Sequence, residues 1–301
     1  MNSPTWRHPG FWPYWSLLRR LAAMLGAADD GGASLLDPSE PAHWCSAEWV
    51  DALNRLAAWR GLKSAKGVPL RFVLAEGDGA LDYERRIHDA GEVACRLEGA
   101  GARHDFHNAL VWLRFPRLKM ACNWLHCREP LGTLSASSSA AGLSDSGRAP
   151  TPTTAAARVR GRGRRRDAIT LLDENGALWP APMPEWVAHL EARRWKALFV
   201  DGRQALLAAA APVVVGHGLM EKMHCPYKSM TAKLLPCMTM PTAGIDRGAA
   251  RHLLEMAEID RFRPAVLLPL PLQGWPGWDP ANQDPVFYED QSVFRSLNRN
   301  G

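Results

Sequence analysis

The sequence predicts an α+β fold: a single helix-rich globular domain with a few short strands and one disordered low-complexity insertion. Segments with helical spacing of apolar residues dominate, and strand-like runs are few and far apart. Apolar residues make up 47% of the chain, which is enough for a substantial core. We expect residues 1–301 to form one domain, with its core in 40–297 and the insertion at 133–165.

The first third of the chain predicts helices that alternate with short extended segments. An amphipathic helix is expected over residues 15–25. A second is expected over 46–59, where the apolar residues share one face and Ser46 is a candidate N-cap. The run PLRFVLA at 69–75 predicts a strand. Residues 82–90 suit a short helix, and 92–97 suit an extended segment.

Residues 133–165 differ from the rest in composition, because they are rich in Ser, Ala, Thr, Pro and Gly and end in RVRGRGRRR. Such a segment has too little apolar surface to offset the entropy lost on ordering, so we expect it to be disordered. Residues 132–166 contain seven Arg and one Asp, a net charge of +6, whereas the whole chain carries +5. The remainder, at −1, lacks the basic face of a nucleic-acid-binding domain, and specific nucleic-acid binding is not expected.

The second half predicts a strand at 167–172 and a turn at 173–176, because an Asn-Gly pair is a strong turn signal. The tail beyond residue 269 is rich in Trp, Pro and Gly and is expected to wrap the body. Between the turn and the tail we expect helices at 185–200, 202–211, 217–224 and 246–259 and strands at 212–215 and 265–268. In the tail we expect four buried aromatic side chains to fill the core: Trp275, Trp278, Phe287 and Phe294.

Cysteine usage and the length of the apolar runs predict a cytoplasmic protein with no membrane association. The six Cys residues are scattered and form no C-x-x-C pair, which is typical of a reduced, intracellular chain. The N-terminus shows no signal-peptide pattern. The longest apolar runs, 205–215 and 265–272, contain Pro and fall far short of the ~20 residues that span a bilayer.

Residues 104–126 hold polar side chains that are unusual for a helix. The run HDFHNALVWLRFPRLKMACNWLH places His, Asn and one Lys among large apolar residues, where ordinary surface helices use Glu, Lys and Arg. At ~100° per residue, its polar positions from His104 to His126 fall within one arc of roughly 100°. Pro116 bends or breaks the helix, and such a bend can form the wall of a pocket.

Two interpretations of this segment stay open. In the functional one, His104 or His126 acts as an acid, a base or a ligand, Lys119 contacts an anion, and the Asn residues orient the ligand. In the structural one, Asp105 is an N-cap, Pro116 starts a second helix, and the Asn and His groups tie helices together.

A second candidate site lies in GHGLMEKMHCP, where His217, Glu221 and His224 share one helix face at i, i+4 and i+7. Two His and a carboxylate form a suitable ligand set for zinc or a similar divalent ion. The pattern differs from H-E-x-x-H, in which the two His lie one turn apart. The alternative is a structural hydrogen bond between His217 and Glu221.

Adjacent carboxylates at Asp173 and Glu174 form a third candidate, since two such groups can hold a cation or accept protons. Asp167 is a further candidate partner for one of the His residues. The alternative is that these acids are ordinary turn residues before Asn-Gly.

Four ordered motifs resemble those of an uncharacterised bacterial family, domain of unknown function 3025. In chain order they are HDFHNALVWLRFPRLKMACNWLH, RDAITLLDENG, GHGLMEK, and PLPLQGWPGWDPAN with FYEDQSVFR. The resemblance runs from about residue 40 to 296, marks the insertion as peculiar to this chain, and implies no established activity. The family pattern has an aromatic residue in place of His107 and does not include His224, which favours His217 with Glu221 over a three-ligand set. The residues that match its motifs are His104, Asp105, Asn108, Trp112, Pro116, Lys119, Asn123, Asp167, Thr170, Asp173, Glu174, Gly176, His217 and Glu221.

Our leading hypothesis is a cytosolic hydrolase-type enzyme that acts on an anionic small substrate, and a divalent metal at His217 and Glu221 is one form of it. The alternatives are a non-catalytic binding or scaffold protein with structural motifs, and a nucleic-acid partner acting through the Arg run. Convergence of His104, Asn108, Lys119, Asp167 and His217 on one open cavity would favour an enzyme or a ligand-binding protein, and separate, packed positions would contradict that interpretation. The expected catalytic residues are His104, Asp105, His217 and Glu221, and the expected binding residues are Asn108, Lys119, Asn123, Asp167, Asp173 and Glu174.

Overall fold

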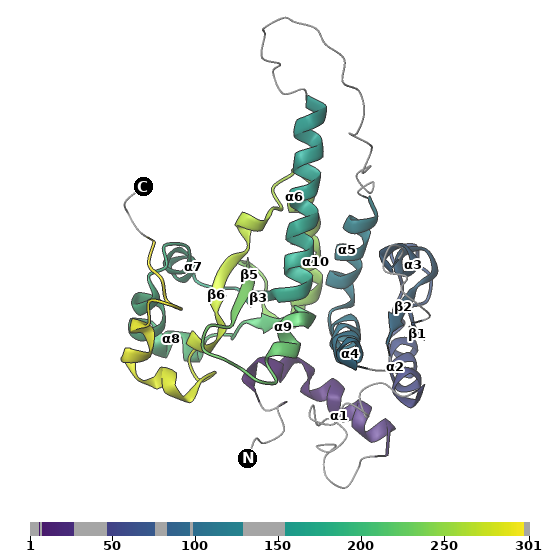
Figure 1. Ribbon diagram of the computed structural model, residues 1–301, viewed down its shortest axis with the longest axis horizontal. Coiled ribbons are helices and arrows are strands. Elements are labelled where there is room, and N and C mark those ends of the chain that lie inside the picture. Colours follow the sequence, from purple (N-terminus) through teal and green to yellow (C-terminus); the bar gives the residue numbers. More distant parts are fainter. Residues whose placement is uncertain are drawn as a thin grey trace, which may run out of the picture.

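A computed structural model of the chain describes residues 6, 8–26, 47–75, 83–96, 99–128 and 154–297. Helices dominate, and the strands form one two-stranded and one four-stranded sheet. Four long helices stand between the two sheets (Figure 1): α4 (Gly99–Arg114), α5 (Pro116–Arg128), α6 (Thr154–Asn175) and α10 (Ile245–Glu258). This arrangement confirms the predicted α+β class with its helix-rich body and few short strands.

The elements before residue 96 follow the sequence prediction. The periodic segments are helices, and the two extended segments pair as a parallel two-stranded sheet, with Phe72 opposite Val93. Gly91 ends α3 with a positive φ of 71°, where a side chain would collide with the Pro69 carbonyl group. Ser46, the expected N-cap, lies outside the described residues. The elements are α1 (Trp15–Met24), α2 (Ala47–Trp59), β1 (Arg71–Leu74), α3 (Tyr83–Ala90) and β2 (Glu92–Cys95).

The polar segment forms two helices, α4 (Gly99–Arg114) and α5 (Pro116–Arg128). Pro116 is the first residue of α5, a position where its missing N–H costs nothing. The carboxylate of Asp246 accepts hydrogen bonds from the backbone N–H groups of Arg117 and Leu118, at 3.2 and 3.0 Å. The predicted break at Pro116 is therefore a helix start that another helix caps.

The predicted strand at 167–172 and the turn at 173–176 are wrong, because α6 (Thr154–Asn175) runs through both. Ala168, Ile169 and Leu172 are buried with helical spacing. The early part of α6, residues 154–165, overlaps the predicted insertion. There the backbone is helical, in keeping with the good helix formers Ala and Arg. Residues 133–153 lie outside the described residues.

Two strands of the four-stranded sheet were not predicted. The sheet has the order β4-β3-β5-β6, with β3 parallel to β5 and the outer pairs antiparallel. Every residue of β3 is buried, so its sequence shows no alternation. The predicted strand at 265–268 occurs three residues later, as β6. The strands are β3 (Gly176–Pro180), β4 (Val213–Val214), β5 (Thr231–Cys237) and β6 (Leu268–Pro271).

The remaining helices lie close to their predicted places, but the helix expected at 185–200 is divided. Arg193, at a φ of 51°, separates α7 from a π-helical turn at Ala197–Asp201. The tail packs as expected, since the four predicted aromatic side chains are buried. No helix within the described ranges is long and apolar enough to cross a membrane. The helices are α7 (Pro184–Glu191), α8 (Arg203–Ala208), α9 (His217–Lys222) and α10 (Ile245–Glu258).

Candidate functional site

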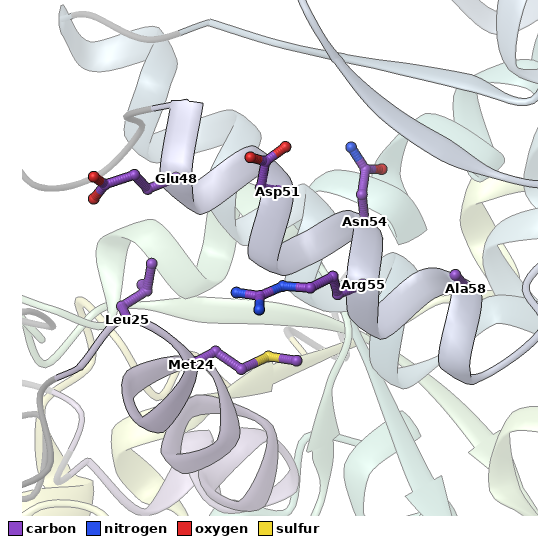
Figure 2. A pocket seen from close by; sticks show the side chains of 7 residues that line it. All are labelled: Met24, Leu25, Glu48, Asp51, Asn54, Arg55 and Ala58. Carbon is purple, nitrogen blue, oxygen red and sulfur yellow. The ribbon is translucent and has the colours of Figure 1, made fainter.

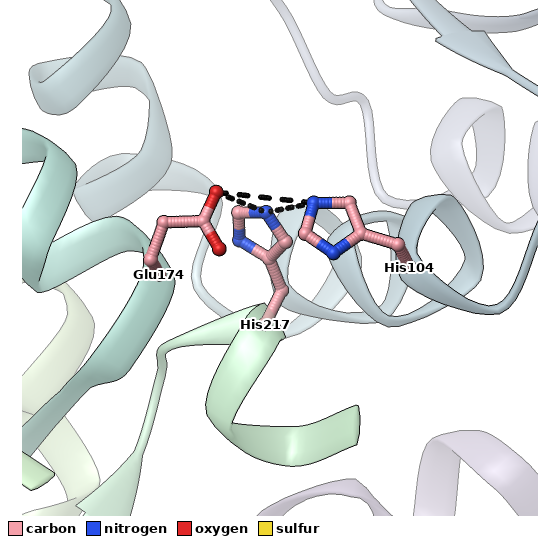
Figure 3. Close-up of side chains that lie close together, drawn as sticks. All are labelled: His104, Glu174 and His217. Carbon is pink, nitrogen blue, oxygen red and sulfur yellow. Dashed lines mark hydrogen bonds and ion pairs between the residues drawn. The ribbon is translucent and has the colours of Figure 1, made fainter. Parts of the chain in front are cut away.

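Three helices bring His104, Glu174 and His217 together (Figure 3). His104 lies on α4, Glu174 lies in the last turn of α6, and His217 is the first residue of α9. The two Nε2 atoms of the histidines are 3.0 Å apart. Glu174 Oε1 lies 3.4 Å from Nε2 of His217 and 3.8 Å from Nε2 of His104. We call these three residues the triad.

The glycines on either side of His217 permit this close approach. A Cβ atom at Gly218 would lie 2.5 Å from Oε2 of Glu174, and one at Gly216 would collide with the backbone of Asn175 and Gly176. The run Gly216-His217-Gly218 therefore lets the start of α9 press against the end of α6.

The triad is buried on one side and open on the other. His217 is only 4% exposed, whereas the side chains of His104 and Glu174 are 30% and 38% exposed. Burial alone would raise the pKa of Glu174, but its contacts with His217 and His104 lower it. The Glu174 side chain is therefore ionised at neutral pH.

Each histidine also has a carboxylate beside the ring nitrogen that faces away from the triad. Glu221 Oε2 lies 3.6 Å from Nδ1 of His104, and Asp173 Oδ2 lies 3.8 Å from Nδ1 of His217. Burial alone would raise the pKa of Asp173, but the charges of Lys119 and His217 lower it. Metal-binding histidines commonly have such a carboxylate at the second nitrogen, because it orients the ring and fixes its tautomer.

The three facing atoms of the triad have the right spacing for a metal ion. With edges of 3.0, 3.4 and 3.8 Å, the point equidistant from them in their plane lies about 2.0 Å from each atom, close to zinc–nitrogen and zinc–oxygen bond lengths. Without a metal, the short Nε2–Nε2 contact is a hydrogen bond, which requires a proton on one of the two nitrogens. The arrangement can therefore hold either a divalent cation or a shared proton.

The sequence matches the family described as "Protein of unknown function (DUF3025)" over residues 70–140 and 148–298. The chain belongs to the DUF3025 family. This confirms the resemblance seen in the motifs. The two matched segments are separated by residues 141–147, which lie within the predicted insertion. No curated protein and no solved structure matches the chain.

Two of the predicted site residues in this DUF3025 protein lie away from the triad. Asp105 binds the guanidinium of Arg96 through both oxygens at 2.8 Å and accepts the Arg96 backbone N–H, so it joins α4 to β2. Asp167 is exposed on α6, two helical turns before Glu174.

The two predicted Asn residues of the polar arc tie helices together. Asn108 donates a hydrogen bond to the Tyr83 hydroxyl at 2.6 Å. Asn123 donates to the backbone carbonyl and to the carboxylate of Glu84, at 2.8 and 2.6 Å. Both contacts reach α3, as the structural interpretation of this segment expects.

Sequence reasoning missed two features of the site. Glu221 shares a helix with His217, one turn apart, but its ion-pair contact is with His104. A second histidine pair, His107 and His224, has its Nε2 atoms 2.7 Å apart in the core. The Gly-His-Gly run at 216–218 is a sequence signal for close packing around His217, although it does not name the partners.

A groove of about 780 Å³ lies elsewhere, between α1 and α2 (Figure 2). It contains no member of the triad, and the side chain of one lining residue, Asn54, already bonds the Phe72 backbone in both directions. We therefore place the candidate site at the triad. The groove is lined by Met24, Leu25, Glu48, Asp51, Asn54, Arg55 and Ala58.

Proposed function

We propose that the protein is a metal-dependent hydrolase in which His104, Glu174 and His217 bind one divalent cation. The observation that carries this proposal is the convergence of three ligand atoms from three separate helices at a spacing that suits a common ion. Three protein ligands leave a further position open for water or substrate, as in catalytic zinc sites.

Zinc fits the spacing better than an octahedral ion does. Two histidines and one carboxylate also bind non-haem iron, but ligands at right angles with bonds of about 2.1 Å lie only about 3.0 Å apart. At tetrahedral angles they lie about 3.4 Å apart. The three edges of the triad are centred on the larger value.

A zinc ion at this place would supply a water molecule that ionises near neutral pH and would polarise the bond to be hydrolysed. The residues of the chain hold and orient it. His217 is fixed in the interior, while His104 and Glu174 line the open side, from which a substrate approaches. Lys119 does not serve as a free anion contact, because it is paired with Asp173 at 2.6 Å.

We further propose a small-molecule substrate and a cytoplasmic location. The cysteines that the structure describes are free thiols, which fits a reducing compartment. Specific nucleic-acid binding is not part of the proposal, because the excess positive charge lies within residues 132–166 rather than on the body that carries the triad.

The test is the metal content of untagged, freshly purified protein by plasma mass spectrometry, followed by calorimetric titration with Zn²⁺. We expect one zinc ion per chain. His217→Ala and Glu174→Gln should lose it, whereas His252→Ala, a control on α10, should keep it. The loaded protein is then screened for hydrolysis of chromogenic esters and phosphoesters.

Protein that neither contains nor binds a divalent cation would overturn the proposal. The histidine pair would then be a structural hydrogen bond, and the alternative of a binding or scaffold protein would gain. Iron in place of zinc would contradict the hydrolase assignment and direct attention to oxygen chemistry.

A further inference from the structure

Behind His217 lies a buried ion pair between Lys119 of α5 and Asp173 of α6. The distance from Nζ to Oδ1 is 2.6 Å, and the two side chains are 6% and 19% exposed. Removing two charges from water costs several kcal/mol per ion, and a well-packed apolar pair is often equally stable or better. Stability alone is therefore a weak reason for this pair.

The second oxygen of Asp173 is directed at the triad. Oδ2 lies 3.8 Å from Nδ1 of His217. That nitrogen is buried and has no hydrogen-bond partner among the described residues. Asp173 also precedes Glu174, so a single turn of α6 places one carboxylate among the ligand atoms and the next one behind a histidine.

We infer that Lys119 and Asp173 are positioning residues for His217. Lys119 holds Asp173 so that its free oxygen faces Nδ1, and the carboxylate keeps the ring proton on Nδ1. The lone pair of Nε2 is then directed at His104 and Glu174, in the form that binds a cation. This inference rests on the proposed metal site.

Glu221 offers an internal comparison for this role. It stands beside Nδ1 of His104 at 3.6 Å, in the same relation as Asp173 to His217. Its side chain is 29% exposed, whereas Asp173 is shielded and held by Lys119. Water screens the exposed carboxylate more strongly, so Asp173 should exert the larger effect on its histidine.

The test uses the full chain and begins without metal. Long-range ¹⁵N–¹H correlation spectra report which ring nitrogen carries the proton, and loss of signals in His217→Gln assigns the ring. We expect the proton of His217 on Nδ1 in the wild type. In Asp173→Asn it should move to Nε2, because an amide can donate to Nδ1.

Zinc affinity is then measured by competition with a chromogenic chelator. We expect Asp173→Asn and Lys119→Met to weaken binding 10- to 100-fold, and Lys119→Arg to restore most of it. Asp246→Asn is the matched control, since Asp246 also touches α5 but only caps it. That control should lower the unfolding temperature and leave both the tautomer and the zinc affinity unchanged.

A wild-type proton on Nε2 of His217, or zinc affinity in Asp173→Asn within twofold of the wild type, would overturn the inference while leaving the metal site intact. A wild type that binds no zinc would instead remove the proposed function. The tautomer measurement would still decide the positioning role in that case. If the variants fail to fold, the measured tautomer of His217 in the wild type decides the positioning role on its own.

Discussion

Two histidine pairs join the same parts of the molecule and differ in almost everything else. His104 and His107 lie on α4, while His217 starts α9 and His224 follows its end. Each pair has its Nε2 atoms in contact, at 3.0 Å for the outer pair (His104 and His217) and 2.7 Å for the inner pair (His107 and His224). The donor atoms are identical, so the surroundings decide the chemistry.

The outer pair is surrounded by negative charge. Carboxylate oxygens of Glu174, Asp173 and Glu221 lie 3.4 to 3.8 Å from its ring nitrogens. One side of the pair is open, and the neighbouring acids favour a proton or a cation between the rings.

The inner pair is enclosed by aromatic rings. Trp6 stacks on His107 with ring centroids 5.6 Å apart and meets the edge of His224 at 4.7 Å. Burial lowers the pKa of His107 well below its usual value and that of His224 to about 3. The carboxylates beside the outer pair, rather than the rings themselves, therefore distinguish the candidate cation site from the inner pair.

The largest expected difference between the two pairs is in zinc binding. His217→Ala should weaken zinc affinity at least 100-fold, roughly 3 kcal/mol, because it removes a ligand. His224→Ala should leave the affinity within threefold of the wild type. Isothermal titration at a temperature where both variants are folded measures this. Equal losses of zinc affinity in the two variants would mean that the outer and inner pairs act as one unit, contrary to the difference described above.

The inner pair should make stability depend on pH. Its folded-state pKa values lie below the unfolded value of about 6.5, so the unfolded chain binds more protons as the pH falls. The stabilisation is therefore fully present above pH 6.5 and is lost as the pH falls towards the folded-state pKa. For His224 the loss is on the order of 2 kcal/mol between pH 7 and 5, and burial of His107 acts in the same direction. Urea unfolding of metal-free protein at pH 7, 6 and 5 measures it.

The matched variant for this prediction is the double substitution His107→Phe and His224→Leu. It should reduce the dependence between pH 7 and 5, since the two imidazoles of the inner pair are then absent. An unchanged slope would show that other groups carry the acid sensitivity.

Gly218→Ala tests whether Glu174 belongs to the cation site at the outer pair. The added methyl would meet Oε2 of Glu174 at 2.5 Å and push that carboxylate away from the histidines. Zinc affinity should fall about tenfold, although alanine in a helix is favoured over glycine by about 1 kcal/mol. Gly244→Ala, where a side chain meets open space, is the control and should change nothing. Unaltered zinc binding in Gly218→Ala would place Glu174 outside the site.

The smallest effect on the site is expected from Asp105→Asn, although Asp105 neighbours His104. It should cost about 1–2 kcal/mol of stability, because it weakens the contacts with Arg96. Zinc affinity should not change. Thermal unfolding and the same titration separate the two effects, and a loss of zinc affinity would return Asp105 to the catalytic set.

The sequence predicted the helices that carry the histidines because local spacing encodes them. The apolar periodicity and Pro116 indicated α4 and α5, and the spacing of His217, Glu221 and His224 indicated α9. The helical structure of α6 was not predicted. Residues 167–172 are a short, mainly apolar run with an Asn-Gly pair close behind it, and this pattern also suits a strand and a turn. Its helical identity comes from packing against distant elements.

The triad itself was beyond sequence reasoning, because its members are far apart along the chain. His104 and His217 are separated by 113 positions. The i, i+4 rule paired Glu221 with His217, but a helix neighbour is only one of the available partners, and His104 of α4 lies within 3.6 Å. Local spacing shows which residues share a face and not which face they meet.

α6 has 22 residues and ends at Asn175, directly beyond Glu174. The peptide dipoles of a helix this long add up to roughly half a negative elementary charge at its carboxyl end. The carboxyl end of α6 therefore contributes an attractive potential for cations at the triad, and the amino end of α9, which begins at His217, contributes one of opposite sign. No side-chain substitution removes either field, and added salt should weaken both.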